Sequence, residues 1–119
     1  MKQKTQLLFA ALLASVTLHA QVAGRLAGSV EDPTGAVIPN ARVSLYLPGG
    51  ATPVMTTQTT SEGLFDFAAV RPDFYRLTVE NPGFTTYTQE NVKVDPSRVT
   101  SLPPIKLEVT ATTQTVEVN

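Results

Sequence analysis

Most of the chain after residue 20 alternates apolar and polar side chains with a period of two. Successive side chains of a β-strand point to opposite faces, so this period predicts strands that are buried on one face and exposed on the other. The positions predicted to face inward are Leu26, Gly28, Val30, Val43, Leu45, Leu47, Phe65, Phe67, Tyr75, Leu77, Val79, Val92, Val94, Ile105, Leu107, Val109, Val116 and Val118. Helical periodicity is almost absent after residue 20, and the pattern therefore indicates an all-β domain.

Short segments rich in Pro, Gly, Asp and Asn separate these runs, at 32–35, 48–50, 61–63, 71–73, 81–83 and 95–97. Such residues fix φ, tolerate positive φ or bond to their own backbone, and they therefore predict turns. Parallel strands need long crossovers, usually helical, which this spacing does not provide. The sequence predicts a seven-stranded antiparallel β-sandwich.

The first 20 residues have the organisation of an export signal. Lys2 and Lys4 precede an apolar run of twelve residues at 7–18, and Ala20 offers a small residue for cleavage. A run of this length is too short to span a bilayer, which takes about 20 apolar residues. We therefore predict a signal peptide at 1–20, a domain at 21–110 and a connector with a short strand at 111–119. The mature chain is then exported without a transmembrane segment, to the periplasm, the outer membrane or the medium.

Composition narrows the function of the predicted mature chain. Loss of Lys2 and Lys4 leaves seven basic against ten acidic residues, a formal charge of −3, which argues against nucleic-acid binding. The chain has no Cys, and its one His, His19, lies in the predicted signal. Zinc sites and nucleophiles paired with His are therefore not expected, and we predict no catalytic residues, no metal and no cofactor.

Acidic side chains are the remaining candidates for catalysis. Two carboxylates can hydrolyse a glycoside, but most of these ten lie in turns or at outward strand positions, where solvated carboxylates are normal. They are Glu31, Asp32, Glu62, Asp66, Asp73, Glu80, Glu90, Asp95, Glu108 and Glu117. Calcium is an alternative at Glu31, Asp32 and Thr34, although a turn accounts for the same residues.

Carbohydrate binding would need exposed rings on one face of the sandwich. The candidates by parity are Tyr46, Phe74 and Tyr87, and there is no Trp. Tyr75 is predicted to point inward instead, where its hydroxyl can tie a corner to nearby backbone, as in the tyrosine corner of other sandwiches.

The order of motifs resembles a known family. The segments 24–43, 61–67, 70–79 and 83–84 look like the carboxypeptidase regulatory-like domain. The resemblance implies a transthyretin-like sandwich of the carbohydrate-binding-like fold type, which accompanies a zinc peptidase without being one. The segments 21–24, 32–36 and 114–118 also resemble the N-terminal extension of TonB-dependent outer-membrane receptors, where the domain precedes a plug and a barrel.

Three interpretations follow. The first is a non-enzymatic accessory or interaction domain of the cell envelope, with an envelope protein or a glycan as partner. It includes both a receptor module and a free-standing relative. The second is a carbohydrate-binding module of the same fold. The third is an enzyme, which would need a concave pocket with paired carboxylates.

Overall fold

The computed structural model describes residues 22–110, which form eight strands and no helix. The strands are β1 (Gly24–Glu31), β2 (Arg42–Tyr46), β3 (Met55–Gln58), β4 (Leu64–Val70), β5 (Asp73–Glu80), β6 (Tyr87–Val94), β7 (Val99–Ser101) and β8 (Ile105–Lys106). The predicted signal peptide and closing strand fall outside the described residues.

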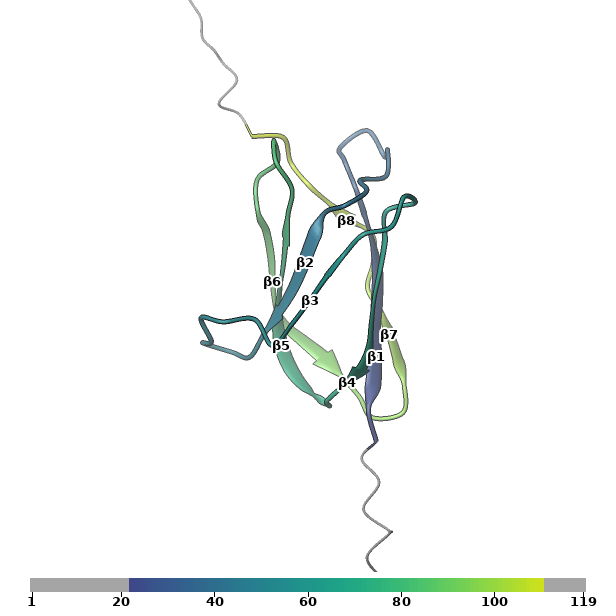
Figure 1. Cartoon of the computed structure of the whole chain (residues 1–119), viewed down its shortest axis with the longest axis vertical. Helices are drawn as coiled ribbons and strands as arrows, with labels where there is room; N and C mark the ends of the chain where they lie inside the picture. Colours follow the sequence, from purple (N-terminus) through teal and green to yellow (C-terminus); the bar gives the residue numbers. More distant parts are fainter. Residues whose placement is uncertain (1–21, 111–119) are drawn as a thin grey trace, which may run out of the picture.

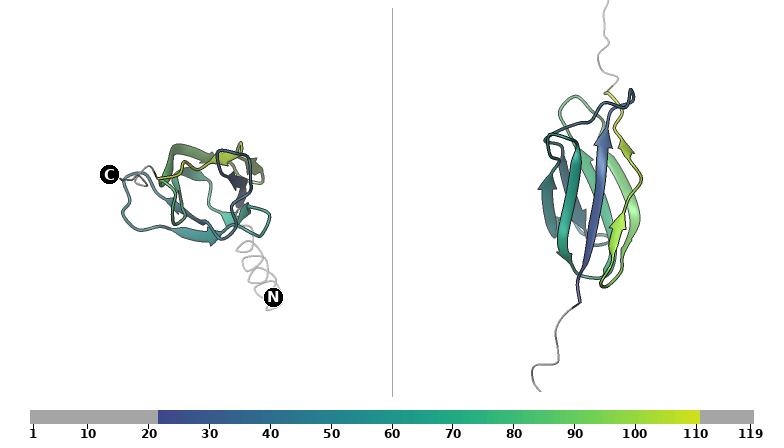
Figure 2. Two further views of the ribbon diagram at one scale, coloured as in Figure 1. Left: turned by 90° about the horizontal axis from the view of Figure 1, so that it is seen from above. Right: turned by 90° about the vertical axis from the view of Figure 1, so that its right-hand side faces the viewer.

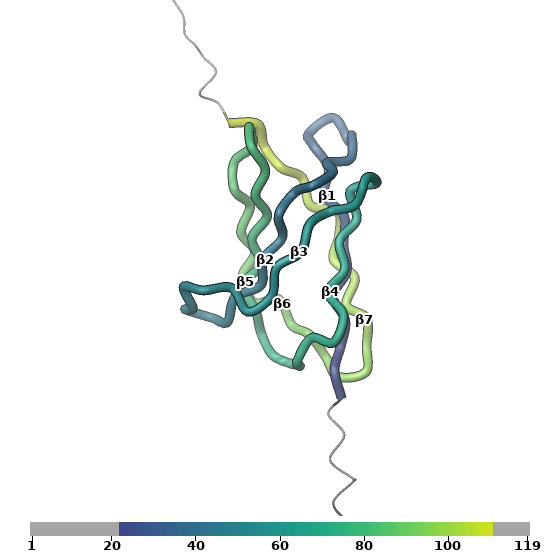
Figure 3. Tube along the Cα trace, in the orientation of Figure 1, coloured from purple at the N-terminus to yellow at the C-terminus, as the bar shows by residue number. Residues whose placement is uncertain are grey.

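Two sheets pack face to face (Figures 1 and 2). One has the order β4-β1-β7, with β8 also paired to β1, and the other has the order β3-β2-β5-β6. The tube in Figure 3 shows that residues 22 and 110 lie at opposite ends of the sandwich. The prediction of an all-β sandwich is confirmed.

The core lies between the sheets and consists mainly of the residues predicted to face inward. Leu26, Val43, Leu45, Leu77, Val79 and Leu107 are fully buried, and the Phe65 and Phe67 rings meet edge to face with centroids 6.2 Å apart. Two predicted core positions are wrong. Leu47, directly after β2, is 43% exposed, and Val109, three residues after β8, is 56% exposed.

Gly28 lets the β1 backbone approach the Phe65 ring. A Cβ at this position would lie 2.6 Å from the Phe65 Cζ atom, which is closer than real side chains come. Phe65 pairs directly with Gly28 across the β1–β4 ladder. The glycine therefore makes room for an aromatic ring in the core.

The strand arrangement departs from the prediction in two ways. β3 and β7 were not predicted, because Met-Thr-Thr-Gln and Val-Thr-Ser have no apolar alternation, yet β3 pairs with β2 over four residues and β7 pairs with β1 over three. β7 and β8 run parallel to β1, whereas every pair was predicted to be antiparallel. After β6 the chain leaves the β3-β2-β5-β6 sheet and joins the sheet that contains β1. β7 and β8 enter that sheet beside β1 and run in the same direction as β1.

Irregularities in register change which side chains face inward. Asn91 in β6 has φ 57°, and the β5–β6 register shifts between Tyr75 and Leu77. An extra residue in one strand reverses the alternation beyond it. Tyr87 consequently pairs with inward-facing Val79 and packs against the core instead of pointing to solvent.

Candidate functional site

The predicted calcium candidates form a turn. Asp32 Oδ1 accepts hydrogen bonds from the Thr34 amide (2.9 Å), the Thr34 hydroxyl (2.7 Å) and the Ala36 amide (3.0 Å). The Thr34 hydroxyl contributes most to holding the pKa of the Asp32 carboxyl below its usual range. A hydrogen-bonded turn therefore accounts for Asp32 and Thr34 at these positions.

The carboxylates of the described residues do not gather into a site. Nowhere in 22–110 do three His, Cys, Asp or Glu side chains lie close enough to hold a metal ion. Asp66 pairs with Arg25 across the exposed face of β4 and β1, and Asp95 lies 3.6 Å from Lys93. Such exposed pairs contribute little to stability.

The predicted inward orientation of Tyr75 is confirmed. The ring is 4% exposed, and its hydroxyl donates a 2.6 Å hydrogen bond to the Arg71 carbonyl. This contact closes the connection between β4 and β5 around Pro72. Tyr75 is therefore a structural residue.

The three rings proposed for stacking on sugars do not form a platform. Tyr87 faces the core, and its hydroxyl donates to Gln89 Oε1. The Arg76 guanidinium lies 4.3 Å from the Tyr46 ring centroid and covers one face of that ring. Phe74 is 47% exposed, with the Lys93 ammonium 6.0 Å from its centroid. One exposed ring is no more than a normal surface feature.

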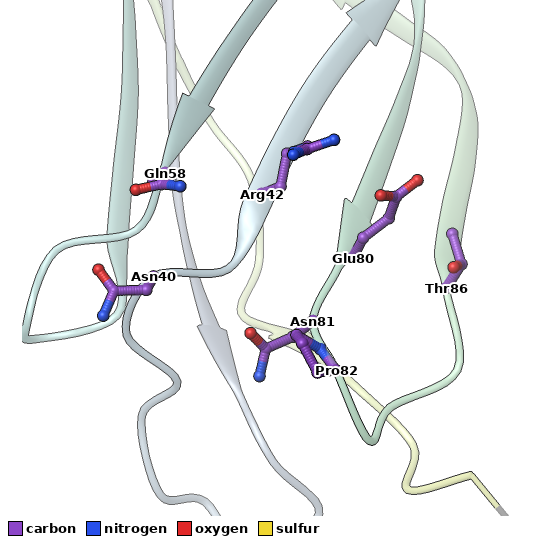
Figure 4. A pocket seen from close by; sticks show the side chains of 7 residues that line it. All are labelled: Asn40, Arg42, Gln58, Glu80, Asn81, Pro82 and Thr86. Carbon is purple, nitrogen blue, oxygen red and sulfur yellow. The ribbon is translucent and has the colours of Figure 1, made fainter.

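A polar pocket of about 350 Å³ opens at the end of the β3-β2-β5-β6 sheet, beside the β5–β6 turn (Figure 4). We call it the polar pocket. Its floor is a row of three cross-strand neighbours, Gln58 on β3, Arg42 on β2 and Glu80 on β5. The remaining lining residues are Asn40, Asn81, Pro82 and Thr86.

One wall of the polar pocket is fixed by a buried threonine. Thr59 is 3% exposed, and its hydroxyl accepts from the Ala41 amide at 2.8 Å and donates to the Ile38 carbonyl at 2.7 Å. The backbone amide of Asn40 donates to the Thr59 carbonyl. Asn40 also adopts φ 61°, which few residue types other than Gly tolerate. The loop before β2 therefore holds the Asn40 side chain at the pocket edge.

The polar side chains of this pocket are not consumed by the fold. Arg42 and Glu80 lie directly opposite each other, yet within the described residues neither takes part in an ion pair. The hydrogen bonds found across 22–110 likewise leave the side chains of Asn40, Gln58, Asn81 and Thr86 without partners. Of these residues, the sequence pointed only to Glu80, as one of the ten candidate carboxylates, and it did not place the six together. The outward parity of Arg42 and Glu80 was the available signal.

A row of hydroxyl side chains runs beside this pocket on the same sheet face. It consists of Thr56, Ser44, Thr78 and Thr88, which are neighbours across β3, β2, β5 and β6. Ser44 and Thr78 are 4% and 9% exposed, and the Thr78 hydroxyl is buried without a hydrogen-bond partner. The Thr56 hydroxyl donates to the Ser44 hydroxyl at 3.4 Å, so Thr78 is the buried side chain of this row that lacks a partner within the described residues.

A more apolar hollow of about 500 Å³ lies where the edge strands β3 and β4 face each other. Leu64 and Phe65 contribute its apolar surface, and Thr57 and Asp66 lie at its edges.

Over residues 22–110 there is no helix long and apolar enough to cross a membrane.

No curated protein matches this chain in sequence. Solved structures do match. The minor pilin GBS52 of Streptococcus agalactiae superposes with a TM-score of 0.59 at 16% identity, over 83% of this chain and 49% of the pilin. A type II cohesin–X–dockerin complex of Acetivibrio cellulolyticus matches with a TM-score of 0.57 at 18% identity, over 71% of this chain and 56% of that chain.

A putative carbohydrate binding protein of Bacteroides uniformis also matches, with a TM-score of 0.57 at 19% identity, over 70% of this chain and 40% of that one. Two dioxygenases share the fold at 13% and 9% identity. This chain spans about half the length of the matched chain in the cohesin–X–dockerin complex, of which it covers 56%. At such identities the likenesses establish a sandwich fold and leave activity open.

The family model of the carboxypeptidase regulatory-like domain matches residues 25–108, which includes every strand from β1 to β8. The matched range also includes the turns at 32–35 and 61–63 and Tyr75. The chain therefore belongs to the carboxypeptidase regulatory-like domain family.

Proposed function

We propose that this chain supplies a non-catalytic accessory domain of the cell envelope, which binds a partner instead of transforming a substrate. The observation that carries the proposal is the family match over 25–108, on a sandwich in which Asp32 is used in a turn and Asp66 in an exposed ion pair. In this proposal the domain is exported by the signal peptide at 1–20. It acts either at the front of a TonB-dependent receptor or as a free-standing relative in the periplasm or medium.

The structural neighbours support an interaction role by their descriptions. One neighbour is described as a minor pilin and another as part of a cohesin–X–dockerin complex, and both carry this fold. Neither identifies a partner for this chain, because their identity to it is below 20%.

Carbohydrate binding is the second candidate, and one observation favours it. The polar pocket gathers amide, guanidinium, carboxylate and hydroxyl groups at one sheet end, and a neighbour from Bacteroides uniformis is described as a putative carbohydrate binding protein. Binding by stacking on Tyr46, Phe74 and Tyr87 is not favoured, since these rings do not share an open surface.

Fractionation and crosslinking in the native cell test the first proposal. A photoreactive amino acid at exposed Val37 or Leu64 should crosslink the domain to an envelope component after export. Placing the same group at buried Leu77 serves as the control and should give no crosslink. Recovery of the chain with residues 1–20 intact in the cytoplasm would contradict the proposal.

A further inference from the structure

We infer that the polar pocket is a binding site for a neutral saccharide, held by hydrogen bonds and not by ring stacking. The inference rests on the proposed interaction role and names a ligand class and a site for it. The first support is its construction. Gln58, Arg42 and Glu80 come from three adjacent strands, so the rigid sheet fixes their spacing.

The donor and acceptor inventory of the pocket matches a polyhydroxylated ligand. Arg42 offers donors only and Glu80 acceptors only, whereas Asn40, Gln58 and Asn81 each offer both. Each hydroxyl of a sugar also donates and accepts. Neighbouring hydroxyls can therefore bond an amide or a guanidinium on one side and a carboxylate on the other.

The charge of the pocket argues against ionic ligands. Arg42 and Glu80 contribute one charge of each sign at adjacent positions, so an anion meets Glu80 and a cation meets Arg42. A neutral ligand avoids both repulsions. Pro82 adds an apolar surface at the rim, against which the C–H face of a sugar ring can pack.

Hydrogen bonds within the fold fix two edges of the polar pocket. Thr59 anchors the loop that carries Asn40, and the Phe84 amide bonds to the Asn81 carbonyl at 3.0 Å across the β5–β6 turn. A preformed site orders few groups on binding, which favours affinity.

Nuclear magnetic resonance titration of the purified protein tests the inference. The probes are cellohexaose, a plain glucan, and chitohexaose, whose N-acetyl groups resemble those of bacterial wall glycans. At least one should shift the side-chain amide signals of Asn40, Gln58 and Asn81 in a saturable way at concentrations up to about 10 mM, a range suited to weak complexes. The probe that binds distinguishes a general glucan ligand from an envelope glycan.

Two variants and a matched control sharpen the test. Arg42→Ala should weaken binding about tenfold or more, the loss expected for a charged hydrogen bond. Arg98→Ala, which changes an exposed arginine between β6 and β7 that does not line the polar pocket, should bind as the unmodified protein does. Inorganic phosphate should shift the pocket signals only in Glu80→Gln, where the cation no longer has an opposing charge.

The inference is overturned if neither hexasaccharide shifts these signals, if the shifts centre on Phe74, or if Arg42→Ala binds normally. An envelope protein crosslinked through Val37 or Leu64 in the absence of any sugar-induced shift would refute the saccharide site and leave the accessory role standing. Sugar-induced shifts of the pocket signals without any crosslink to an envelope component would support the saccharide site and contradict the proposed accessory role.

Discussion

The hydroxyl of Tyr75 donates a 2.6 Å hydrogen bond to the carbonyl of Arg71, four residues earlier in the chain. The contact joins the start of β5 to the connection that follows β4, and the ring itself fills the core. One side chain thus supplies both apolar burial and a partner for backbone that the strand ladders do not pair.

Replacing Tyr75 by Phe should keep the ring and remove this hydrogen bond. We expect the free energy of unfolding to fall by about 1 kcal/mol, the usual net value of one buried hydrogen bond. Tyr46→Phe is the control, because no hydrogen bond of the Tyr46 hydroxyl is found in the described residues. Equal urea midpoints for Tyr75→Phe and the unmodified protein would show that the corner contact contributes nothing.

Burial also raises the pKa of Tyr75 above its ordinary value of 10.0. The folded state then holds the phenol proton more tightly than the unfolded state does. This contribution to stability is complete below pH 10 and is lost as the pH rises through the higher folded pKa. Tyr75→Phe should therefore lose less stability than the unmodified protein between neutral and strongly alkaline pH.

Phe67→Ala tests the core. The ring is 3% exposed and meets Phe65 edge to face, so truncation should cost about 3 to 5 kcal/mol through lost burial and the cavity left behind. A loss of that size is a large part of a domain's total stability. An urea midpoint close to that of the unmodified protein would mean that the strand register is wrong by one residue.

Arg76 is a different case, because sequence parity makes it an ordinary surface residue. In the structure its guanidinium covers the Tyr46 ring and donates a 2.9 Å hydrogen bond to the Gly50 carbonyl. Arg76→Ala should therefore cost about 1 kcal/mol, more than the half kcal/mol typical of free surface sites. Arg98→Ala is the matched comparison, and equal midpoints for the two variants would show that these contacts are energetically idle.

Asp32 provides a test at acidic pH. Its carboxyl pKa lies below the ordinary 3.8, chiefly because the Thr34 hydroxyl donates to it. The associated stability is present above pH 3.8 and is lost as the pH falls through the lower folded pKa. Titration of the carboxyl carbon by nuclear magnetic resonance should show a higher pKa in Thr34→Val, and an unchanged pKa would refute the role of the hydroxyl.

Metal removal should leave the domain folded. The predicted mature chain has neither His nor Cys, and the Asp32 turn is held by its own hydrogen bonds. Addition of EDTA should not shift the melting temperature, and added calcium should not raise it. A clear shift with either reagent would reveal an oxygen-ligand site.

Processing of the chain can be tested by mass spectrometry of the exported protein. The apolar run ends at Leu18, and β1 begins at Gly24, so we expect the mature N-terminus between residues 20 and 24. Detection of an exported form that retains residues 1–20 would contradict the signal-peptide prediction.

The sequence by itself determined the strands that carry apolar alternation and the turns between them. Leu26, Val43 and Leu77 are buried because period two is a local property of extended backbone, readable without knowing what the strand pairs with. The same holds for the Asp32 turn, whose hydrogen bonds join residues at most four apart. The orientation of Tyr75 was predictable for a related reason. Its parity points the ring inward, and its place just after a turn lets the hydroxyl reach nearby backbone, as in a tyrosine corner.

Tertiary structure decided everything that depends on pairing between distant segments. β3 is a strand because β2 pairs with it, while its own side chains give no signal, and the shift at Asn91 turns Tyr87 inward against the parity of its strand. The polar pocket has the same origin. Asn40, Gln58 and Glu80 lie far apart in the chain and meet because sheet order and register place their strands side by side, which no local pattern specifies.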